Sequence, residues 1–261
     1  MFEFITSSRI GGRIPLAAVS GLKVEELQRE EPASSVEQHM RIYAVNVSHP
    51  LDSTLQQRLT ALCSSRRRER LPRFYHQEDA RRSLMAEMLL RAAIRADWSQ
   101  CGQGSELQFA ENGYGKPYLE GMEGLHYNLS HSGLWCVCAV STVPVGIDVE
   151  QIHQQELDWV EQYLSAEEKA ELRSGTEGER IRRFYEIWTM KESYVKAVGT
   201  GLSLGLNTFS VVGEGLTQLA PYHMKRYNLD ALHPVAVCAE GLHFPATIQI
   251  YTAEGIGNLL A

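Results

Sequence analysis

Apolar and polar positions recur with two different periods along the chain, and the two periods predict helices and strands. Apolar residues three and four apart predict helices over 51–70, 80–98 and 176–198. Short β-branched runs bounded by Gly, Pro, Asn and Ser predict strands. The predicted strands are 41–47, 107–110, 127–129, 134–140, 145–150, 209–212, 224–227, 235–239 and 247–251. A capping box, Ser165-Ala166-Glu167-Glu168, predicts the start of one more helix.

The order of these elements indicates two similar α+β subdomains that meet near residue 145. Each half contains one or two helices and several strands, which indicates an α+β architecture. We therefore expect a pseudo-dimer, with a first subdomain over 40–145 and a second over 146–261. Residues 1–39 have no strong apolar period and are rich in Glu, Gln, Ser and Pro over 25–37, which predicts a loosely ordered extension.

Composition and charge narrow the classes of function. The chain has 261 residues, of which 44% are hydrophobic and 22% charged, and its formal net charge is −7. An acidic chain disfavours binding of duplex nucleic acid over its whole surface. The longest apolar run, 134–140, is too short to cross a bilayer. No secretory signal is visible, and five cysteines without framework spacing suit a reducing compartment, so we expect a cytoplasmic protein.

Two carboxylates project from one face of the strand predicted over 145–150. Asp148 and Glu150 share that face because side chains alternate along a strand. Magnesium suits such a pair, since it prefers oxygen and usually takes one or two carboxylates together with phosphates and water. A solvated rim of exposed acids is the more common role of such a pair.

The helix predicted over 176–198 adds a third acid. Glu192 and Lys196 lie four residues apart on one helix face, which fits an exposed ion pair worth about 0.3–0.5 kcal/mol. Trp188 and Val195 border the same face, so Glu192 lies at the edge of the apolar stripe, where an acid needs a partner. A metal ion, or a role as general base beside Lys196, would supply one.

Basic residues cluster in the first half of this acidic chain. The cluster consists of Arg66, Arg67, Arg68, Arg70, Arg73, Arg81 and Arg82. It fits either a solvated helix face or a phosphate grip, because the guanidinium fork matches phosphate oxygens. Lys116 stands in a Gly-Lys-Pro turn and could serve the same ligand. The segment 128–133, Asn-Leu-Ser-His-Ser-Gly, could contact an anion or satisfy turn amides.

The two acidic motifs together resemble a known family. Gly146-Ile147-Asp148-Val149-Glu150, followed by Trp188-Thr189-Met190-Lys191-Glu192-Ser193-Tyr194-Val195-Lys196, is similar to the signature motifs of the 4′-phosphopantetheinyl transferases, and most similar to those of their Sfp-type branch. Supporting segments occur in the family's order at 73–80, 115–117, 128–133 and 201–203. The resemblance covers residues 40–250 and leaves out 1–39.

The resemblance implies a pseudo-dimeric α+β fold with coenzyme A bound in the cleft between the halves. It implies magnesium-dependent transfer of the phosphopantetheine group to a serine of an apo carrier protein, with release of adenosine 3′,5′-bisphosphate. The implied magnesium ligands are Asp148, Glu150 and Glu192. The implied coenzyme A contacts are Arg67, Arg70, Arg82, Ser83, Lys116, Ser130, His131 and Lys196. Arg67 and Arg70 stand where relatives carry lysine, so the positive charge that meets the 3′-phosphate is kept.

The implied reaction assigns roles to three residues. Glu192, directly or through a water, is expected to take the proton of the attacking serine hydroxyl, which is a weak nucleophile without a base. Lys196 and His131 are expected to stabilise phosphate charge. One chain with two fused halves would suffice as a monomer.

The carrier is expected to dock near Gly199–Asp230, where Leu202, Leu204 and Leu206 accompany Lys225 and Arg226. Carriers of secondary metabolism, including antibiotic biosynthesis, are the preferred substrates, and neither nucleic acid nor a membrane is expected as a partner. Two alternatives stay open: a non-catalytic module that binds a nucleotide or a carrier, and a magnesium-dependent nucleotide hydrolase.

Overall fold

The computed structural model describes residues 39–98, 107–154, 157–241 and 243–261. The extension expected over 1–39 lies outside these residues, apart from His39. The first half contains β1 (Met40–Asn46), α1 (Ser53–Leu62), α2 (Ser65–Arg70), η2 (Leu71–Arg73), α3 (Gln77–Asp97), β2 (Phe109–Glu111), β3 (Pro117–Leu119), β4 (His126–Ser132) and β5 (Trp135–Ser141).

The second half begins with β6 (Val145–Val149), η4 (Glu161–Tyr163), α4 (Ala166–Arg173) and α5 (Glu177–Val198). It continues with η5 (Gly201–Ser203), η6 (Leu206–Thr208), η7 (Gly213–Leu219), β7 (Tyr222–Asn228), β8 (Pro234–Glu240), β9 (Gln249–Tyr251) and α6 (Ala253–Leu259). The mixed composition and the order of these elements confirm the expected α+β class.

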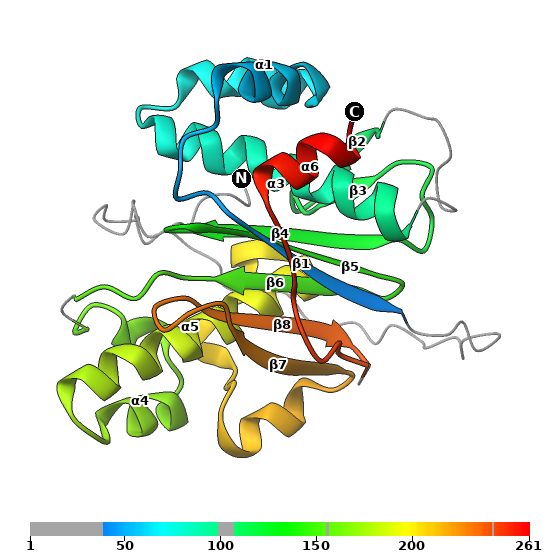
Figure 1. Ribbon diagram of the computed structural model, residues 1–261. Helices are drawn as coiled ribbons and strands as arrows, with labels where there is room; N and C mark the ends of the chain where they lie inside the picture. Colours follow the sequence, from blue (N-terminus) through cyan, green and yellow to red (C-terminus); the bar gives the residue numbers. More distant parts are fainter. Residues whose placement is uncertain (1–38, 99–106, 155–156, 242) are drawn as a thin grey trace.

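Two sheets form the centre of the molecule (Figure 1). The first has the order β4-β5-β1-β9 and the second the order β6-β8-β7, while β2 and β3 form a separate hairpin. Figure 1 shows α1, α3 and α6 on the outer side of the first sheet and α4 on the opposite side of the molecule. Helix α5 packs on β6 and β8 of the second sheet. The sheets therefore lie between two sets of helices, one set covering each sheet.

Three buried clusters follow from this layering. One cluster joins α3 to the outer face of the first sheet, through residues such as Leu89 and Tyr127. A second surrounds α5, with Phe184 and Trp188 at its centre. The third lies between the two sheets and contains Val137 of β5 as well as Ile147 and Val237 of the second sheet. Since both sheets contribute apolar side chains to that shared cluster, the two halves pack directly on one another.

The end of the chain returns to the first half. Strand β9 pairs with β1 in parallel, with Ala44 opposite Ile250. Helix α6 then packs on α1 and α3 and buries Ile256 in the first cluster. Strand β9 and helix α6, which lie in the range expected to form the second subdomain, therefore pack on elements of the first half.

Two elements differ from the sequence-based expectations for local reasons. The helix expected over 51–70 is divided into α1 and α2, because Cys63 is extended and Ser64 caps the new helix. The strand expected over 209–212 is irregular instead. There the amide of Val211 donates to the Glu168 carboxylate at 2.9 Å, so a side chain rather than a neighbouring strand satisfies it.

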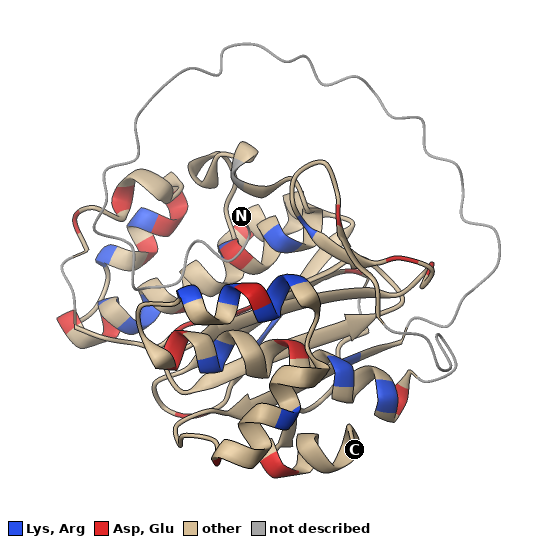
Figure 2. Cartoon of the chain, turned by 90° about the horizontal axis from the view of Figure 1, so that it is seen from above, with Lys and Arg blue, Asp and Glu red and all other residues tan. Residues whose placement is uncertain are grey.

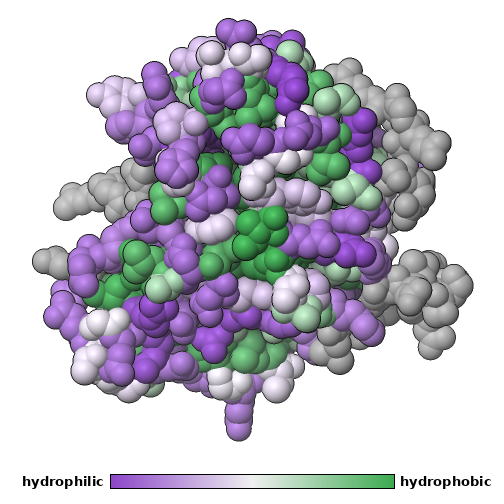
Figure 3. All heavy atoms as spheres, viewed as in Figure 1, coloured by the Kyte–Doolittle hydropathy of each residue, from purple (hydrophilic) through white to green (hydrophobic). Residues whose placement is uncertain are grey.

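Polar residues cover most of the face shown in Figure 3, and apolar residues are visible in the band between the two halves. Within the described residues, no helix combines the length and the apolar character needed to cross a lipid bilayer. The capping box at the start of α4 forms as predicted between Ser165 and Glu168, and Leu172 of this helix belongs to the second cluster.

Candidate active site

Strands β4 and β6 are joined by polar side chains rather than by a backbone ladder. The amides of Ile147 and Gln151 donate to Asn128 Oδ1 at 2.8 Å and to Ser132 Oγ at 3.0 Å. The Ser130 and Ser132 hydroxyls in turn donate to the carboxylates of Asp148 and Glu150, both at 2.8 Å. The period-two alternation thus holds Asp148 of β6 and Glu150, the residue that follows β6, in fixed orientations.

Helix α5 adds a lysine and a third acid to this place. Lys196 Nζ lies 2.6 Å from Asp148 Oδ1 and 3.2 Å from Ser130 Oγ. Glu192, one turn earlier on the helix, is 6% exposed. The isolated Glu192–Lys196 ion pair that the spacing allowed is therefore not the arrangement observed, because the lysine's close partner is Asp148.

Close approach of α5 to β6 depends on a glycine. A Cβ atom added at Gly146 would lie 2.1 Å from the carbonyl oxygen of Ser193 and 2.4 Å from the amide nitrogen of Ala197. Only a residue without a side chain therefore lets the two backbones approach so closely. This contact brings Glu192 and Lys196 within reach of the β6 acids.

Burial raises the pKa values of all three acids, and repulsion from Asp148 adds to the rise for Glu150 and Glu192. Burial raises the pKa of Asp148, although the Lys196 ammonium opposes the rise. Burial and the neighbouring Asp148 charge raise the pKa of Glu150 well above its usual range. Burial raises the pKa of Glu192 to about 7, against the lowering effect of Lys196. Burial alone would lower the pKa of Lys196, but the surrounding carboxylates raise it. Three buried acids thus share one ammonium group.

This arrangement fits a divalent cation supplied with further oxygen ligands. Asp148 Oδ2 and Glu192 Oε1 are buried and have no hydrogen-bond partner, which is costly for carboxylate oxygens unless a cation satisfies them. Within the described part of the chain, no group of three or more His, Cys, Asp or Glu side chains is already spaced to hold a metal ion. The expected three-ligand set is therefore not preformed. Magnesium typically takes only one or two carboxylates and completes its shell with phosphates and water.

The basic residues gather on the neighbouring side of β4. His131 lies on the face of β4 opposite Ser130, the face whose Leu129 packs against the α3 cluster. Arg82 of α3 donates to the carbonyl of Gly133, just after β4, at 2.9 Å and to Asp79 at 2.6 Å. Figure 2, which looks onto this side from above, shows Lys and Arg interleaved with Asp and Glu along the helices.

The α2 arginine that was expected to grip phosphate is held by protein groups. Arg67 Nε donates to the Glu87 carboxylate at 2.8 Å, and its Nη1 donates to Ser83 Oγ at 2.6 Å. Ser83, another expected contact of coenzyme A, is 2% exposed. Both residues therefore belong to a polar network between α2 and α3. Arg70, at the end of α2, is half-buried.

Lys116, another expected contact of coenzyme A, donates to backbone carbonyls of the second half. Its Nζ donates to the carbonyl of Ala197 at 2.8 Å and to that of Val145 at 3.2 Å. Burial lowers the pKa of Lys116 to about 8. Because carbonyls at a helix C-terminus lack partners within the helix, this ammonium completes the end of α5. The lysine of the first half thus fastens the β2–β3 hairpin to the second half.

Sequence reasoning missed Asn128 and Ser132, although a signal for both was present. Asn128, Ser130 and Ser132 recur at every second position of β4, opposite the acids that recur at every second position of β6. The sequence interpretation considered these groups as anion contacts or turn caps. It did not consider that they would pair with a strand of the other half.

The expected docking segment exposes fewer apolar side chains than predicted. Leu206 is 7% exposed and belongs to the cluster around α5, against which Leu204 also packs. The side chain of Leu202 lies outside the described residues. Arg226 is exposed and pairs with Glu186 at 2.8 Å, whereas Lys225 donates to the carbonyl of Pro245. Arg226 therefore presents a charged side chain at the surface of this segment.

Comparisons with known proteins agree with the geometry. A family model described as the 4′-phosphopantetheinyl transferase superfamily matches residues 144–238. A model of the N-terminal part of 4′-phosphopantetheinyl transferases matches residues 49–143. A 4′-phosphopantetheinyl transferase of Bacillus subtilis is 36% identical, over 82% of this chain and 99% of its own length. The Sfp transferase of Bacillus subtilis strain 168 is 34% identical over the same shares, and the psf-1 transferase of Bacillus pumilus is 33% identical over 83% and 97%.

The acidic site lies where two α+β halves meet, and the matches extend over nearly the full length of several relatives. The chain therefore belongs to the 4′-phosphopantetheinyl transferase superfamily and is a transferase of this type. Its similarity to Sfp and psf-1 assigns it to the Sfp-type branch. The resemblance first seen in two short motifs is therefore confirmed.

Proposed function

We propose that this protein transfers the 4′-phosphopantetheine group from coenzyme A to a serine of an apo carrier protein. In that reaction the serine oxygen forms a bond to the phosphorus that carries pantetheine, and the bond from that phosphorus to the bridging oxygen breaks. Adenosine 3′,5′-bisphosphate leaves. The observation that carries the proposal is the trio of buried acids around one lysine, two of them with carboxylate oxygens that lack a partner.

Asp148 and Glu192 would hold magnesium through those unpartnered oxygens, with Glu150 beside them. When bound, the metal would neutralise charge on the diphosphate of coenzyme A. Lys196 would balance the charge of the acids and of the departing phosphate from its place beside Asp148. Glu192, directly or through a water, would take the proton of the serine hydroxyl.

Coenzyme A would extend from this acidic centre toward the basic residues beside β4. Arg70, Arg82 and His131 supply positive charge or hydrogen-bond donors on that side, and the turn after Ser132 connects it to the acids. The contacts of Lys116 with the protein support a role in holding the site together, and those of Arg67 hold its guanidinium in one orientation. We propose that the carrier docks along Gly199–Asp230, with exposed Arg226 facing acidic residues of the carrier.

Mass spectrometry of an apo peptidyl carrier incubated with the protein, coenzyme A and magnesium tests the proposal. A gain of one phosphopantetheine unit, lost with a chelator and absent from a carrier whose acceptor serine is replaced by alanine, is the expected result. Binding of coenzyme A without any mass change would indicate a binding module. Consumption of coenzyme A without a carrier would indicate a hydrolase.

The role of Glu192 has a separate test. Glu192→Gln keeps the size of the side chain but removes the base, so turnover should fall by roughly two orders of magnitude or more. Glu177→Gln, at an exposed position in the first turn of the same helix, serves as the control and should retain wild-type turnover. Near-normal turnover of Glu192→Gln at saturating magnesium would refute the assignment of the base.

A further inference from the structure

Helix α2 carries most of the arginine cluster but contributes no buried residue to the fold. A helix of this length has no stability of its own in water, so its position depends on contacts with the rest of the protein. For α2 these contacts are polar. Arg68 donates to the carbonyls of Ala61 and Cys63 at the end of α1, and Arg66 pairs with Glu111 of β2.

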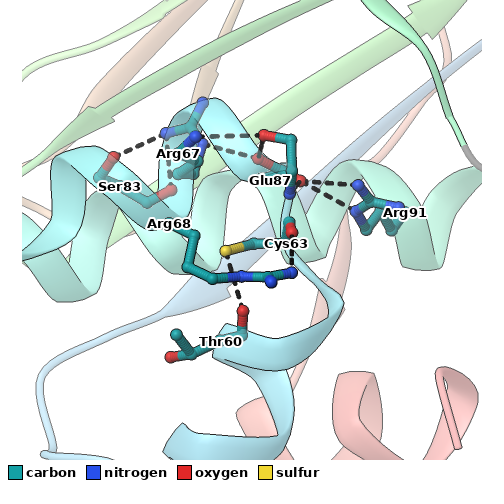
Figure 4. A network of polar contacts seen from close by, with 8 residues as sticks. Thr60, Cys63, Arg67, Arg68, Ser83, Glu87 and Arg91 are labelled. Carbon is teal, nitrogen blue, oxygen red and sulfur yellow. Dashed lines mark hydrogen bonds and ion pairs between the residues drawn. The ribbon is translucent and has the colours of Figure 1, made fainter.

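One buried carboxylate forms the centre of this polar attachment (Figure 4). Glu87 lies in the middle of α3 and is 1% exposed. The amide and the hydroxyl of Ser64, the N-cap of α2, donate to it at 2.7 and 2.9 Å. Arg67 Nε donates to the same carboxylate at 2.8 Å, and Arg91 approaches it from the next turn of α3 at 2.9 Å.

Glu87 therefore contacts both the start of α2 and a side chain that α2 presents. Nη1 of the same guanidinium donates to the carbonyl and to the hydroxyl of Ser83, at 2.8 and 2.6 Å. A guanidinium held at two edges has a fixed plane, which is the condition for directional contact with an anion. The buried carboxylate thus sets the position of α2 and the orientation of Arg67.

We propose that Glu87 is a positioning residue for the binding of coenzyme A: it fixes α2 on α3 so that the arginines of α2 meet the 3′-phosphate. This inference rests on the proposed function, since it concerns the same substrate. Glu87 itself is too deeply buried to contact that ligand. Its effect should therefore appear in the recognition of the 3′-phosphate and leave the acidic centre around Asp148 unchanged.

The test compares coenzyme A with 3′-dephospho-coenzyme A as substrates of Glu87→Gln. Glutamine keeps the shape of the side chain but removes the negative charge to which Ser64 and Arg67 donate. The KM for coenzyme A should rise about tenfold, while the KM for the dephospho form and the kcat for both stay within twofold of wild type. An equal rise of KM for both substrates, or a fall of kcat alone, would overturn the proposal.

Arg91→Gln is the matched control. It removes a partner of the same carboxylate from within α3, so it perturbs the ion pair without removing a contact of α2. We expect a loss of thermal stability comparable to that of Glu87→Gln, with the wild-type ratio of the two KM values. A raised ratio in this control would mean that general weakening of the first half explains the effect.

Ser64→Ala keeps the proposal testable if Glu87→Gln does not fold. It removes one of the three hydrogen bonds that Ser64 and Arg67 donate to Glu87, because the amide of residue 64 remains. The same KM ratio should rise about threefold, and an unchanged ratio would count against the proposal. Calorimetric binding of adenosine 3′,5′-bisphosphate and of adenosine 5′-phosphate gives a readout independent of turnover. If the wild-type protein transfers nothing, the proposed function is refuted. If Glu87→Gln binds each of the two nucleotides as tightly as wild type does, the role of Glu87 is refuted.

Discussion

At the scale of single residues, Glu192 is a source of instability in the protein without metal. Its carboxylate is buried, carries an oxygen without a partner and lies near Asp148, and these conditions raise its pKa to about 7. Between pH 4.5 and 7 the folded state therefore binds a proton that the unfolded chain does not bind. The free energy of unfolding must fall as pH rises through this range.

Glu192→Gln should consequently stabilise the metal-free protein while it lowers turnover. The free energy of unfolding of the variant relative to wild type should increase by about 2 kcal/mol between pH 5 and pH 8. Urea denaturation in the presence of a chelator measures the difference. The exposed Glu177→Gln variant should show no such pH dependence, and a difference for Glu192→Gln that is equal at both pH values would contradict the prediction.

The sequence predicted the identities of these residues but not how they pair. Period-two alternation placed Asp148 and Glu150 on one face, and the structure keeps that face. Spacing along one helix suggested that Glu192 pairs with Lys196, yet the lysine lies on Asp148 of another element. Local periodicity describes neighbours within an element, whereas the partner of a buried charge is set by tertiary packing, which one sequence does not reveal.

At the scale of elements, the site depends on the contact between α5 and β6. The backbone of α5 approaches β6 at Gly146, where an added methyl group would overlap main-chain atoms of Ser193 and Ala197. Main-chain atoms of a long helix cannot move aside separately. A side chain at this position must therefore shift the whole helix.

Gly146→Ala should reduce stability by about 3 kcal/mol, the upper end of the usual cost of overpacking. It should also lower kcat about a hundredfold, because it displaces Glu192 and Lys196 from the β6 acids. Gly178→Ala is the control, since nothing lies within 4 Å of its added Cβ, and it should leave kcat unchanged. Thermal unfolding and transfer assays measure both. A Gly146→Ala enzyme with wild-type kcat would show that the close contact is not needed for the site.

Elements with a long regular period and most of the strands were predicted well, and the errors fall on a few short or irregular segments. The periods predicted α3 and α5 to within a few residues, and the capping box of α4 was predicted correctly. The sequence interpretation missed β3 and α6, and it assigned a strand to 209–212. That segment has the apolar, β-branched pattern of a strand, but its amide partner is the buried Glu168. Pattern alone does not distinguish these two ways of satisfying a buried backbone.

At the scale of the molecule, three kinds of contact hold the halves together. The apolar cluster between the sheets provides the buried apolar contact area. The polar side chains of β4 fix how β4 is aligned along β6. Lys116 and Asn112 of the hairpin complete the end of α5 by donating to the carbonyls of Ala197 and Gly199. In addition, the chain itself links the halves, because β9 follows the second half in sequence and pairs with β1 of the first. The acidic site therefore depends on both halves, as the two-subdomain prediction required, although the sequence did not reveal the crossover of the last strand.

The surface of the second half offers a place to test recognition of the carrier. Arg226 is exposed within the proposed docking segment and pairs with Glu186, while Arg173 of α4 is equally exposed and pairs with Glu161 outside that segment. Charge reversal at either position breaks an ion pair of the same kind. The two variants should thus have similar stability, because exposed pairs contribute little to it.

Arg226→Glu should raise the KM for an acidic carrier about fivefold, which corresponds to an interface charge worth about 1 kcal/mol, and leave the KM for coenzyme A unchanged. The increase should shrink as salt is added, since screening weakens contacts between exposed charges. Arg173→Glu should leave both constants at their wild-type values. Equal effects of the two substitutions would indicate a response to net charge alone, and no effect of either would move the docking surface away from Gly199–Asp230.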